Sequence, residues 1–284
     1  MWLYDFFIAI NMKTVIPSEI TSVQLQTIMQ TAVSPRPIAL ASTVDKNGSQ
    51  NLSPFSFFNM FSTVPPILIF SPSRRVRDNT TKHTLENVLE VPEVVIGTVN
   101  FPIVQQISLA STEYETGVNE FIKSGLTMKD ADLVKPKLIE ECPVNFECKV
   151  LEIKSLGDLG GAGNLVICEV QKIHIREEYL NEAGNLDQQK LDMVARLGSN
   201  WYSRSNENSL FEVPKPLVTK GIGFDLLPDA IKYSTIFTGN DLGMLANVEV
   251  LPSGEYHADE NVHQDAQKLL LESKIEEAWK VLIK

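Results

Sequence analysis

Residues 51–59 read Asn-Leu-Ser-Pro-Phe-Ser-Phe-Phe-Asn, and residues 74–84 read Arg-Arg-Val-Arg-Asp-Asn-Thr-Thr-Lys-His-Thr. The first stretch is aromatic and hydroxylic. The second gathers four cations between Arg74 and Lys82, in a chain whose formal net charge is -11. A helix N-terminus presents free N–H groups and the positive end of a dipole. An aromatic surface close to such a cationic helix start suits a ligand with a flat ring and a phosphate tail.

The composition excludes several classes of protein. With 284 residues, 43% of them apolar, the chain can bury the core of one large domain or two small ones. Its negative charge disfavours nucleic acid, because that binding needs many cations to neutralise phosphates. The three cysteines, Cys142, Cys148 and Cys168, form no CxxC pair and no Cys/His metal spacing. They are expected to be buried apolar residues in a reducing compartment, and no metal site is predicted.

The start of the chain, residues 1–11, is apolar but short. A membrane span needs about 20 apolar residues. A secretory signal would need a basic start and a small-residue cleavage site, and neither is present. This segment is therefore expected to be an upstream extension or a docked arm. The chain is predicted to be cytoplasmic and to have no membrane partner.

Strands dominate the predicted secondary structure up to about residue 205. Apolar runs rich in β-branched residues predict strands at residues 38–43, 67–71, 94–99, 144–153 and 165–175. Asn47-Gly48 supplies the positive φ angles of a tight hairpin, so the chain should return antiparallel through residues 50–53. Few long helices separate these strands. The pattern favours an antiparallel barrel over a doubly wound parallel sheet.

Helices are expected beside this sheet. Thr21 and Gln24 form a capping-box pattern at the start of a helix that ends near residue 31. Residues 81–89 predict another helix, with Thr80 or Thr81 as its cap. Residues 103–110 are predicted to be helical, and residues 113–135 to be a loop with short helical turns.

The last quarter of the chain has a different sequence pattern from the strand-rich part before it. Residues 214–228 are irregular, whereas residues 258–284 contain no Pro or Gly and carry a broad apolar stripe at helical spacing. A single amphipathic helix is predicted there, with His257 and His263 solvated. Residues 206–284 are interpreted as an extension that packs on the first domain or on a partner subunit.

Both opening stretches have a structural interpretation beside the functional one. Phe55, Phe57 and Phe58 are either packed in a core turn or form walls around a flat heterocycle. The charged run is either a solvated face or a phosphate site, and the hydroxyls that open its helix favour the phosphate. The glycines between residues 157 and 163 do not spell GxGxxG and predict a hairpin turn. His174, near a strand end, is either buried and paired or faces a ligand.

Several segments, taken together and in order, resemble the flavin reductase-like family, which are FMN-binding split-barrel proteins of the flavoredoxin type. These segments are SPRPIA at 34–39, LSPFSFFN at 52–59, PP at 65–66, KHTLEN at 82–87, EF at 120–121, GLT at 125–127 and RLG at 196–198. The resemblance covers residues 14–205, which are interpreted as an FMN-binding split-barrel domain. Residues 206–284, the extension ending in the amphipathic helix, lie outside it.

The resemblance implies a mainly β fold: an antiparallel Greek-key split β-barrel with peripheral helices, to which this chain adds a C-terminal helical extension. It also implies a homodimer with FMN near the subunit interface. The family often has Lys-Asp-Thr at positions 82–84, so His83 departs from its pattern. The implied cofactor-binding residues are Ser53, Pro54, Phe55, Ser56, Phe57, Phe58 and Asn59 around the ring and ribityl chain, and Arg36, Lys82 and Thr84 near the phosphate, with Ser71 and Arg75.

The resemblance also implies an activity. The expected function is an FMN-dependent oxidoreductase, an NAD(P)H:flavin reductase that passes reduced flavin or electrons to a small-molecule or protein acceptor. FMN carries the redox chemistry, so no catalytic side chain is predicted. NADH or NADPH would need only an open face of the ring on which to stack. Two alternatives stay open: an electron carrier without nicotinamide activity, and an assembly protein that binds no flavin.

Overall fold

The computed structural model describes residues 11–284, which divide into two compact units. We call residues 11–210 the barrel unit and Phe211–Lys284 the helical unit. The prediction of an extension or docked arm concerns residues that, apart from Asn11, lie outside this range. Among the described residues, no helix has the length and apolar composition needed to cross a membrane.

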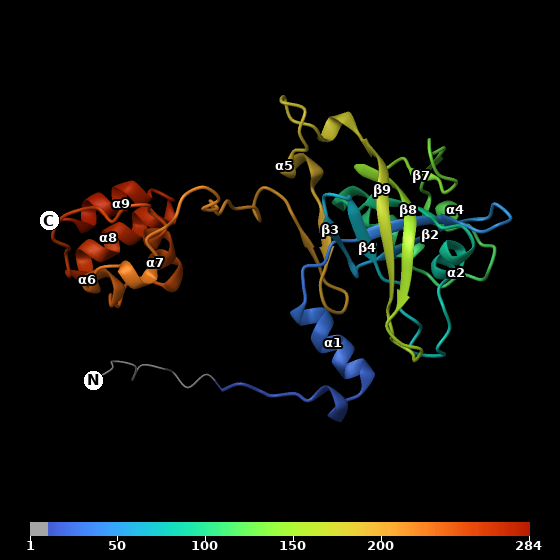
Figure 1. The fold of residues 1–284 in the computed structure, drawn as a ribbon, viewed down its shortest axis with the longest axis horizontal. Helices are drawn as coiled ribbons and strands as arrows, with labels where there is room; N and C mark the ends of the chain where they lie inside the picture. Colours follow the sequence, from blue (N-terminus) through green and yellow to red (C-terminus); the bar gives the residue numbers. More distant parts are fainter. Residues whose placement is uncertain (1–10) are drawn as a thin grey trace. The chain divides into compact units, whose positions relative to one another are not determined.

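A seven-stranded antiparallel sheet forms the barrel unit, with the strand order β2-β1-β5-β8-β9-β4-β3 (Figure 1). All five predicted strands are present with small shifts at their ends, and the glycine-containing segment joins β8 to β9 as the expected hairpin. The strands are β1 Ala39–Val44, β2 Gln50–Phe55, β3 Phe58–Ser62, β4 Ile67–Phe70, β5 Glu93–Thr98, β8 Val144–Ser155 and β9 Asn164–Ile175.

The connection between β2 and β3 forces this sheet to curl. These strands are the two opposite edges of the sheet, yet only Ser56 and Phe57 separate them. In a flat sheet the edges would be roughly 29 Å apart, at about 4.8 Å per strand. Three peptide links span at most about 11 Å. The edges must therefore meet, and residues 56–57 mark the seam where they do.

β2 is also longer than expected. The sequence predicted that pairing ends at Ser53, but β2 continues through Pro54 to Phe55, with Pro54 opposite Leu40 of β1. An edge strand tolerates proline, because the missing N–H would have pointed away from the ladder. β3 was not predicted at all. Its exposed apolar residues, among them Met60 and Phe61, do not alternate with polar ones.

Alternation along the sheet places apolar side chains in two cores. Ala39 and Ala41 of β1 face a cluster that contains Phe55 and Phe70, whereas Leu40 faces the other cluster. Two short sheets complete the unit, β6 Met128–Lys129 with β7 Leu138–Ile139, and β10 Val194–Arg196 with β11 Tyr202–Arg204. Its helices are α1 Ser22–Ala32, α2 His83–Glu90, α3 Val104–Ala110, α4 Glu120–Ser124 and α5 Gln188–Leu191.

The capping box at Thr21 and Gln24 is formed as predicted, but the predicted cap of α2 is wrong. α2 begins at His83, after Lys82, and no side chain caps it. Thr80 does not cap α2, because its hydroxyl donates to Asp78 at 2.6 Å. The Thr81 hydroxyl donates to Glu86. Both hydroxyls therefore bond to carboxylates and leave the first amides of α2 uncapped.

The helical unit has a core of its own, built around Ile231, Leu245, Leu270 and Leu282. The single helix predicted for residues 258–284 is wrong, because Ser273 takes a positive φ of 58° and separates α8 from α9. His263 is 2% exposed and not solvated, and its ring contacts Ser234 Oγ at 2.8 Å. The helices are α6 Asp229–Lys232, α7 Gly239–Ala246, α8 Glu260–Leu271 and α9 Ile275–Leu282.

Candidate flavin site

A hollow with a cavity volume of about 590 Å³ lies at the seam between β2 and β3. We call it the aromatic hollow. It gathers six of the predicted ligand-binding residues: Arg36, Ser56, Phe57, Phe58, Asn59 and Ser71. The rest of its lining comes from residues 32–37 together with Phe61, Ile69 and Leu165. Its volume lies within the range of about 300–1,000 Å³ that is typical of small-molecule sites.

Arg36 lines the aromatic hollow, and most of its donors are already engaged. Its Nη1 donates to the Gln30 carbonyl and, at 2.7 Å, to the Val33 carbonyl. Its Nη2 donates to the Leu197 carbonyl at 2.9 Å, and its Nε lies 3.4 Å from Ser56 Oγ. Burial lowers the pKa of Arg36, with a further contribution from nearby Arg196. Arg36 therefore anchors backbone at the hollow.

A second, much smaller cavity contains the other predicted polar residues, Ser53, Arg75, Lys82 and Thr84. We call it the cationic cleft. Its cavity volume is about 20 Å³, which is room for about one water. Arg36 does not line it, so the expectation that Arg36 lies beside Lys82 and Thr84 is not met. The remaining lining residues are Asn51, His83, Ala110, Ser111, Thr112, Glu113, Tyr114 and Glu120.

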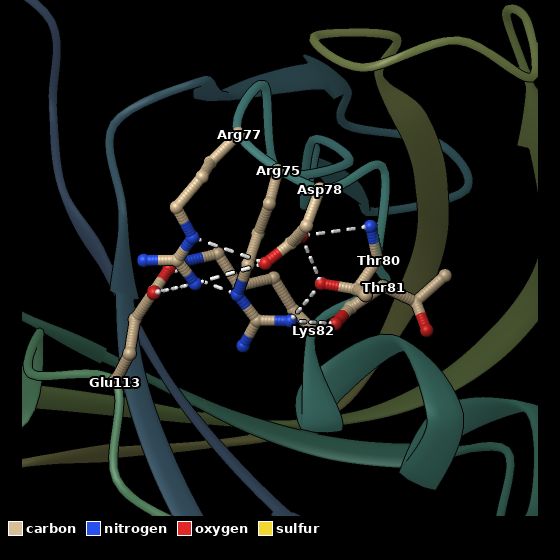
Figure 2. A network of polar contacts seen from close by, with 7 residues as sticks. All are labelled: Arg75, Arg77, Asp78, Thr80, Thr81, Lys82 and Glu113. Carbon is tan, nitrogen blue, oxygen red and sulfur yellow. Dashed lines mark hydrogen bonds and ion pairs between the residues drawn. The ribbon is translucent and has the colours of Figure 1, made fainter.

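Figure 2 shows how the cations of this cleft are held. The Arg75 Nε donates to Glu113 Oε1 at 2.9 Å, and its Nη1 donates to Thr80 Oγ1 at 2.9 Å. Arg77 lies 3.3 Å from the other oxygen of Glu113, and Lys82 Nζ lies 3.5 Å from Oε1. The hydrogen bond from Arg75 is the main reason that the pKa of Glu113 is lowered. One carboxylate thus bridges three cations.

Asp78 holds the turn from which these cations project. Its carboxylate accepts from the Thr80 hydroxyl and from Arg77 Nη2 at 2.9 Å. The hydrogen bond from Thr80, followed by the one from Arg77, lowers the pKa of Asp78 to about 2. Asn79 takes a positive φ of 57° to close this turn. Side-chain hydrogen bonds within the turn therefore hold it in one conformation.

The glycine-rich hairpin between β8 and β9 supports the same turn. The Gly161 amide donates to the Arg74 carbonyl at 3.0 Å, and the Arg74 amide donates to the Ala162 carbonyl at 2.8 Å. A Cβ on Gly160 would lie 3.0 Å from the Arg75 carbonyl oxygen. Glycine is needed there for this close approach of two backbones. The hairpin therefore positions the cationic turn.

Thr84 faces a buried polar network. It is 1% exposed, and its hydroxyl donates to Asn51 Oδ1 at 2.9 Å. Asn87 Nδ2 in turn donates to Thr43 Oγ1 at 3.1 Å. Beside this network Glu120 accepts the Leu52 amide at 3.0 Å, and burial raises the pKa of Glu120. Thr84 thus fixes the start of α2 against the sheet.

Two of the predicted residues line neither cavity. Phe55 packs in the core, with its ring centroid 5.4 Å from that of Phe70. This position agrees with the packed-phenylalanine interpretation for Phe55. Pro54 lies on the edge strand β2. Ser53 and Ser56, one at each cavity, are separated by roughly 10 Å of extended chain, at about 3.3 Å per residue.

A further polar cluster lies on β8 and β9, outside both cavities, and no local sequence pattern pointed to its central residue, Glu147. Glu147 is 0% exposed and contacts His174 Nε2 at 2.6 Å, so His174 is paired, although it is only half-buried and also lines a cavity beside β8 and β9. Asp132 completes three possible metal ligands, but it pairs with Lys172. The cysteines are buried as predicted, and burial raises the pKa of Cys148 to about 12.

Comparison with known proteins agrees with this architecture. A family model described as flavin reductase like domain matches residues 31–192, more than half of the chain. The protein therefore belongs to the flavin reductase-like family. A protein of Aquifex aeolicus (strain VF5) that carries no assigned function is 36% identical over 173 residues, which are 61% of this chain and 86% of that protein.

Solved structures with a similar fold confirm the split-barrel class, among them a structure from Shewanella frigidimarina described as having a split barrel domain, which is 23% identical with a TM-score of 0.60 over 70% of this chain and 95% of that chain. Nitrilotriacetate monooxygenase component B from Bacillus cereus is 24% identical, with a TM-score of 0.66 over 72% of this chain and 99% of that chain. Flavoredoxin of Desulfovibrio vulgaris is 19% identical, with a TM-score of 0.55 over 66% of this chain and 93% of that chain. At these identities the likeness concerns the fold alone.

Proposed function

We propose that this protein binds FMN and acts as an NAD(P)H:flavin reductase that passes reduced flavin or electrons to a separate acceptor. One observation carries the proposal. In a member of the flavin reductase-like family, an aromatic hollow and a cationic cleft lie at the two ends of a short segment, Ser53 to Ser56, which includes the end of β2. The hollow would hold the flavin ring, and the cleft would hold the phosphate.

The residues at the hollow fit a flat heterocycle. Phe57 is partly exposed and has the Arg36 guanidinium 5.9 Å from its ring centroid, so both can contact a planar ligand. Ser56, Asn59 and Ser71 provide polar atoms for its edge. Flavin, when bound, supplies the hydride and electron chemistry. The protein needs only to orient the ring and leave one face open to the nicotinamide.

A homodimer is part of the proposal. α1 contains no buried residue, and Val23, Ile28 and Met29 on it are exposed. Met60 and Phe61 on the edge strand β3 are more than 60% exposed. Unpartnered apolar residues of this kind mark interaction surfaces. A second copy would cover them next to the hollow. A cytoplasmic location, where NADH and NADPH are available, also belongs to the proposal.

The first prediction concerns activity. Anaerobic mixing of the protein with FMN and NADH or NADPH is expected to bleach the visible flavin absorbance faster than the same mixture without protein. The physical reason is that a bound ring is held at stacking distance from the nicotinamide. A rate equal to the protein-free rate with both nucleotides, together with tight FMN binding, would instead support an electron carrier. Absence of FMN binding would favour an assembly protein.

The second prediction concerns the phosphate. Lys82→Ala is expected to weaken FMN binding about tenfold, the loss of one charge-assisted contact of about 1.4 kcal/mol. Riboflavin, which has no phosphate, should bind both proteins alike. Lys46→Ala is the matched control, because Lys46 is an exposed lysine that pairs with Glu90 and lines neither cavity. Fluorescence titration of both flavins gives the affinities. Equal weakening for both flavins would remove Lys82 from the phosphate contact.

A further inference from the structure

Glu113 lines the cationic cleft and pairs with the cations around it. Its two carboxylate oxygens contact Arg75, Arg77 and Lys82, at 2.9, 3.3 and 3.5 Å. In Figure 2 the three cationic side chains and this carboxylate point toward one another. An oxyanion bridging cations at hydrogen-bonding distance is the arrangement that a phosphate would adopt. Glu113 thus makes the kind of contacts that a phosphate group would make.

The size of the cleft supports this comparison. With the segment from Ser111 to Tyr114 against it, the cavity volume is only about 20 Å³, room for about one water, so a phosphate needs Glu113 to move aside. The charges around Glu113 support the same comparison with a phosphate. Arg75, Arg77 and Lys82 carry three positive charges, against which Glu113 and Asp78 place two negative ones. If Glu113 leaves, Arg75 and Lys82 lose the carboxylate that pairs with them, and an anion such as a phosphate can take its place.

The segment that carries Glu113 contributes no residue to the two hydrophobic cores of the barrel unit. It belongs to the connection between α3 and α4, in which residues 111–113 and 115–117 are exposed. Gly117 takes a positive φ of 88°, and its Cβ position would meet nothing within 4 Å. Apart from the contacts of Glu113, one side-chain contact joins the connection to α2, between Thr116 and His83 at 3.2 Å.

We propose that Glu113 is an internal competitor for the flavin phosphate. In the flavin-free protein it holds the three cations and closes the cleft, and the phosphate displaces it on binding. The effect is to weaken the hold on FMN, so that flavin can exchange. This inference rests on the proposed function for its ligand. Riboflavin has a neutral tail with no charge to displace Glu113. Its affinity should therefore not depend on Glu113.

The test is Glu113→Gln, which keeps the shape of the side chain and removes its charge. FMN affinity is expected to increase about fivefold, the value of roughly 1 kcal/mol of partly exposed ion pairing. Riboflavin affinity should not change. Glu115→Gln is the matched control, since Glu115 is an exposed glutamate on the same connection and outside the cleft lining. An FMN affinity that falls, or stays equal to that of the Glu115 variant, would overturn the inference.

Hydrogen exchange of the amides in residues 111–118 gives a second readout that needs no flavin. Glu113→Gln should exchange faster there than the parent protein. Inorganic phosphate should speed exchange in the parent protein and change the variant little. If neither protein binds FMN, the proposed function fails while this readout still decides the role of Glu113. Exchange that is unaffected by both the substitution and phosphate would show that Glu113 is not displaced.

Discussion

Glu147→Ala is expected to lower the free energy of unfolding of the barrel unit by about 3–5 kcal/mol. Glu147 is 0% exposed in the first half of β8, and its carboxylate accepts from three backbone amides. The amides of Asp132, Leu133 and Val134 lie at 3.0, 2.6 and 3.2 Å from it. Removing the carboxylate leaves these donors without a partner and the loop 131–135 without its anchor.

The same contacts give the effect a pH dependence. Burial alone would raise the pKa of Glu147, but hydrogen bonds from the Asp132 amide, His174 and the Leu133 amide outweigh it and leave the pKa lowered. A carboxyl whose pKa is lowered by folding stabilises the protein above its unfolded-state pKa. That stabilisation is lost as the pH falls through the folded-state value. The difference between the parent protein and Glu147→Ala should therefore shrink in acid.

Urea unfolding followed by hydrogen exchange and mass spectrometry measures this effect, because peptides from the barrel unit are read separately from those of the helical unit. Glu152→Ala is the control, since Glu152 is an exposed glutamate on the same strand and should change stability by at most about 0.5 kcal/mol. Two variants with equal, small effects would contradict the role assigned to Glu147.

The sheet was predictable because its strands carry the signal locally. β-branched runs and the Asn47-Gly48 turn define the β1–β2 hairpin without any distant contact. The break between α8 and α9 was not predictable in this way. No Pro or Gly marks it, and Ser273 takes its positive φ within a tertiary arrangement that folds α9 back on α8. Tertiary packing overrides helical spacing there.

The placement of the candidate-site residues was predictable only where those residues lie close together in sequence. The cations and hydroxyls of residues 74–84 lie close together in sequence, so their joint placement could be inferred. Glu113 could not be found, because it lies 38 residues from Arg75 and no local pattern connects the two. For Arg36, the position near the site was predicted but its contacts were not. Its charge was predicted to face a phosphate, but carbonyl groups of α1 and of residue 197 receive its hydrogen bonds instead.

This placement of Arg36 leads to the other large expected effect. Arg36→Ala should lower the free energy of unfolding of the barrel unit by about 2–4 kcal/mol and loosen α1. Arg36 is 7% exposed, and its guanidinium ties the carbonyls of Gln30 and Val33, at the end of α1, to that of Leu197. Because α1 contains no buried residue, few other contacts can replace these bonds.

Arg36→Lys is expected to lower the free energy of unfolding almost as much. An ammonium cannot direct its donors in the fixed planar fork that reaches these separate carbonyls. Lys46→Ala serves as the control, because Lys46 is an exposed cation that lines neither cavity and pairs only at the surface with Glu90. Hydrogen exchange of residues 22–32 should accelerate in both Arg36 variants and not in the control. If α1 instead exchanges at the parent rate while FMN binding collapses and riboflavin binding persists, Arg36 contacts the phosphate after all, and the anchoring role is wrong.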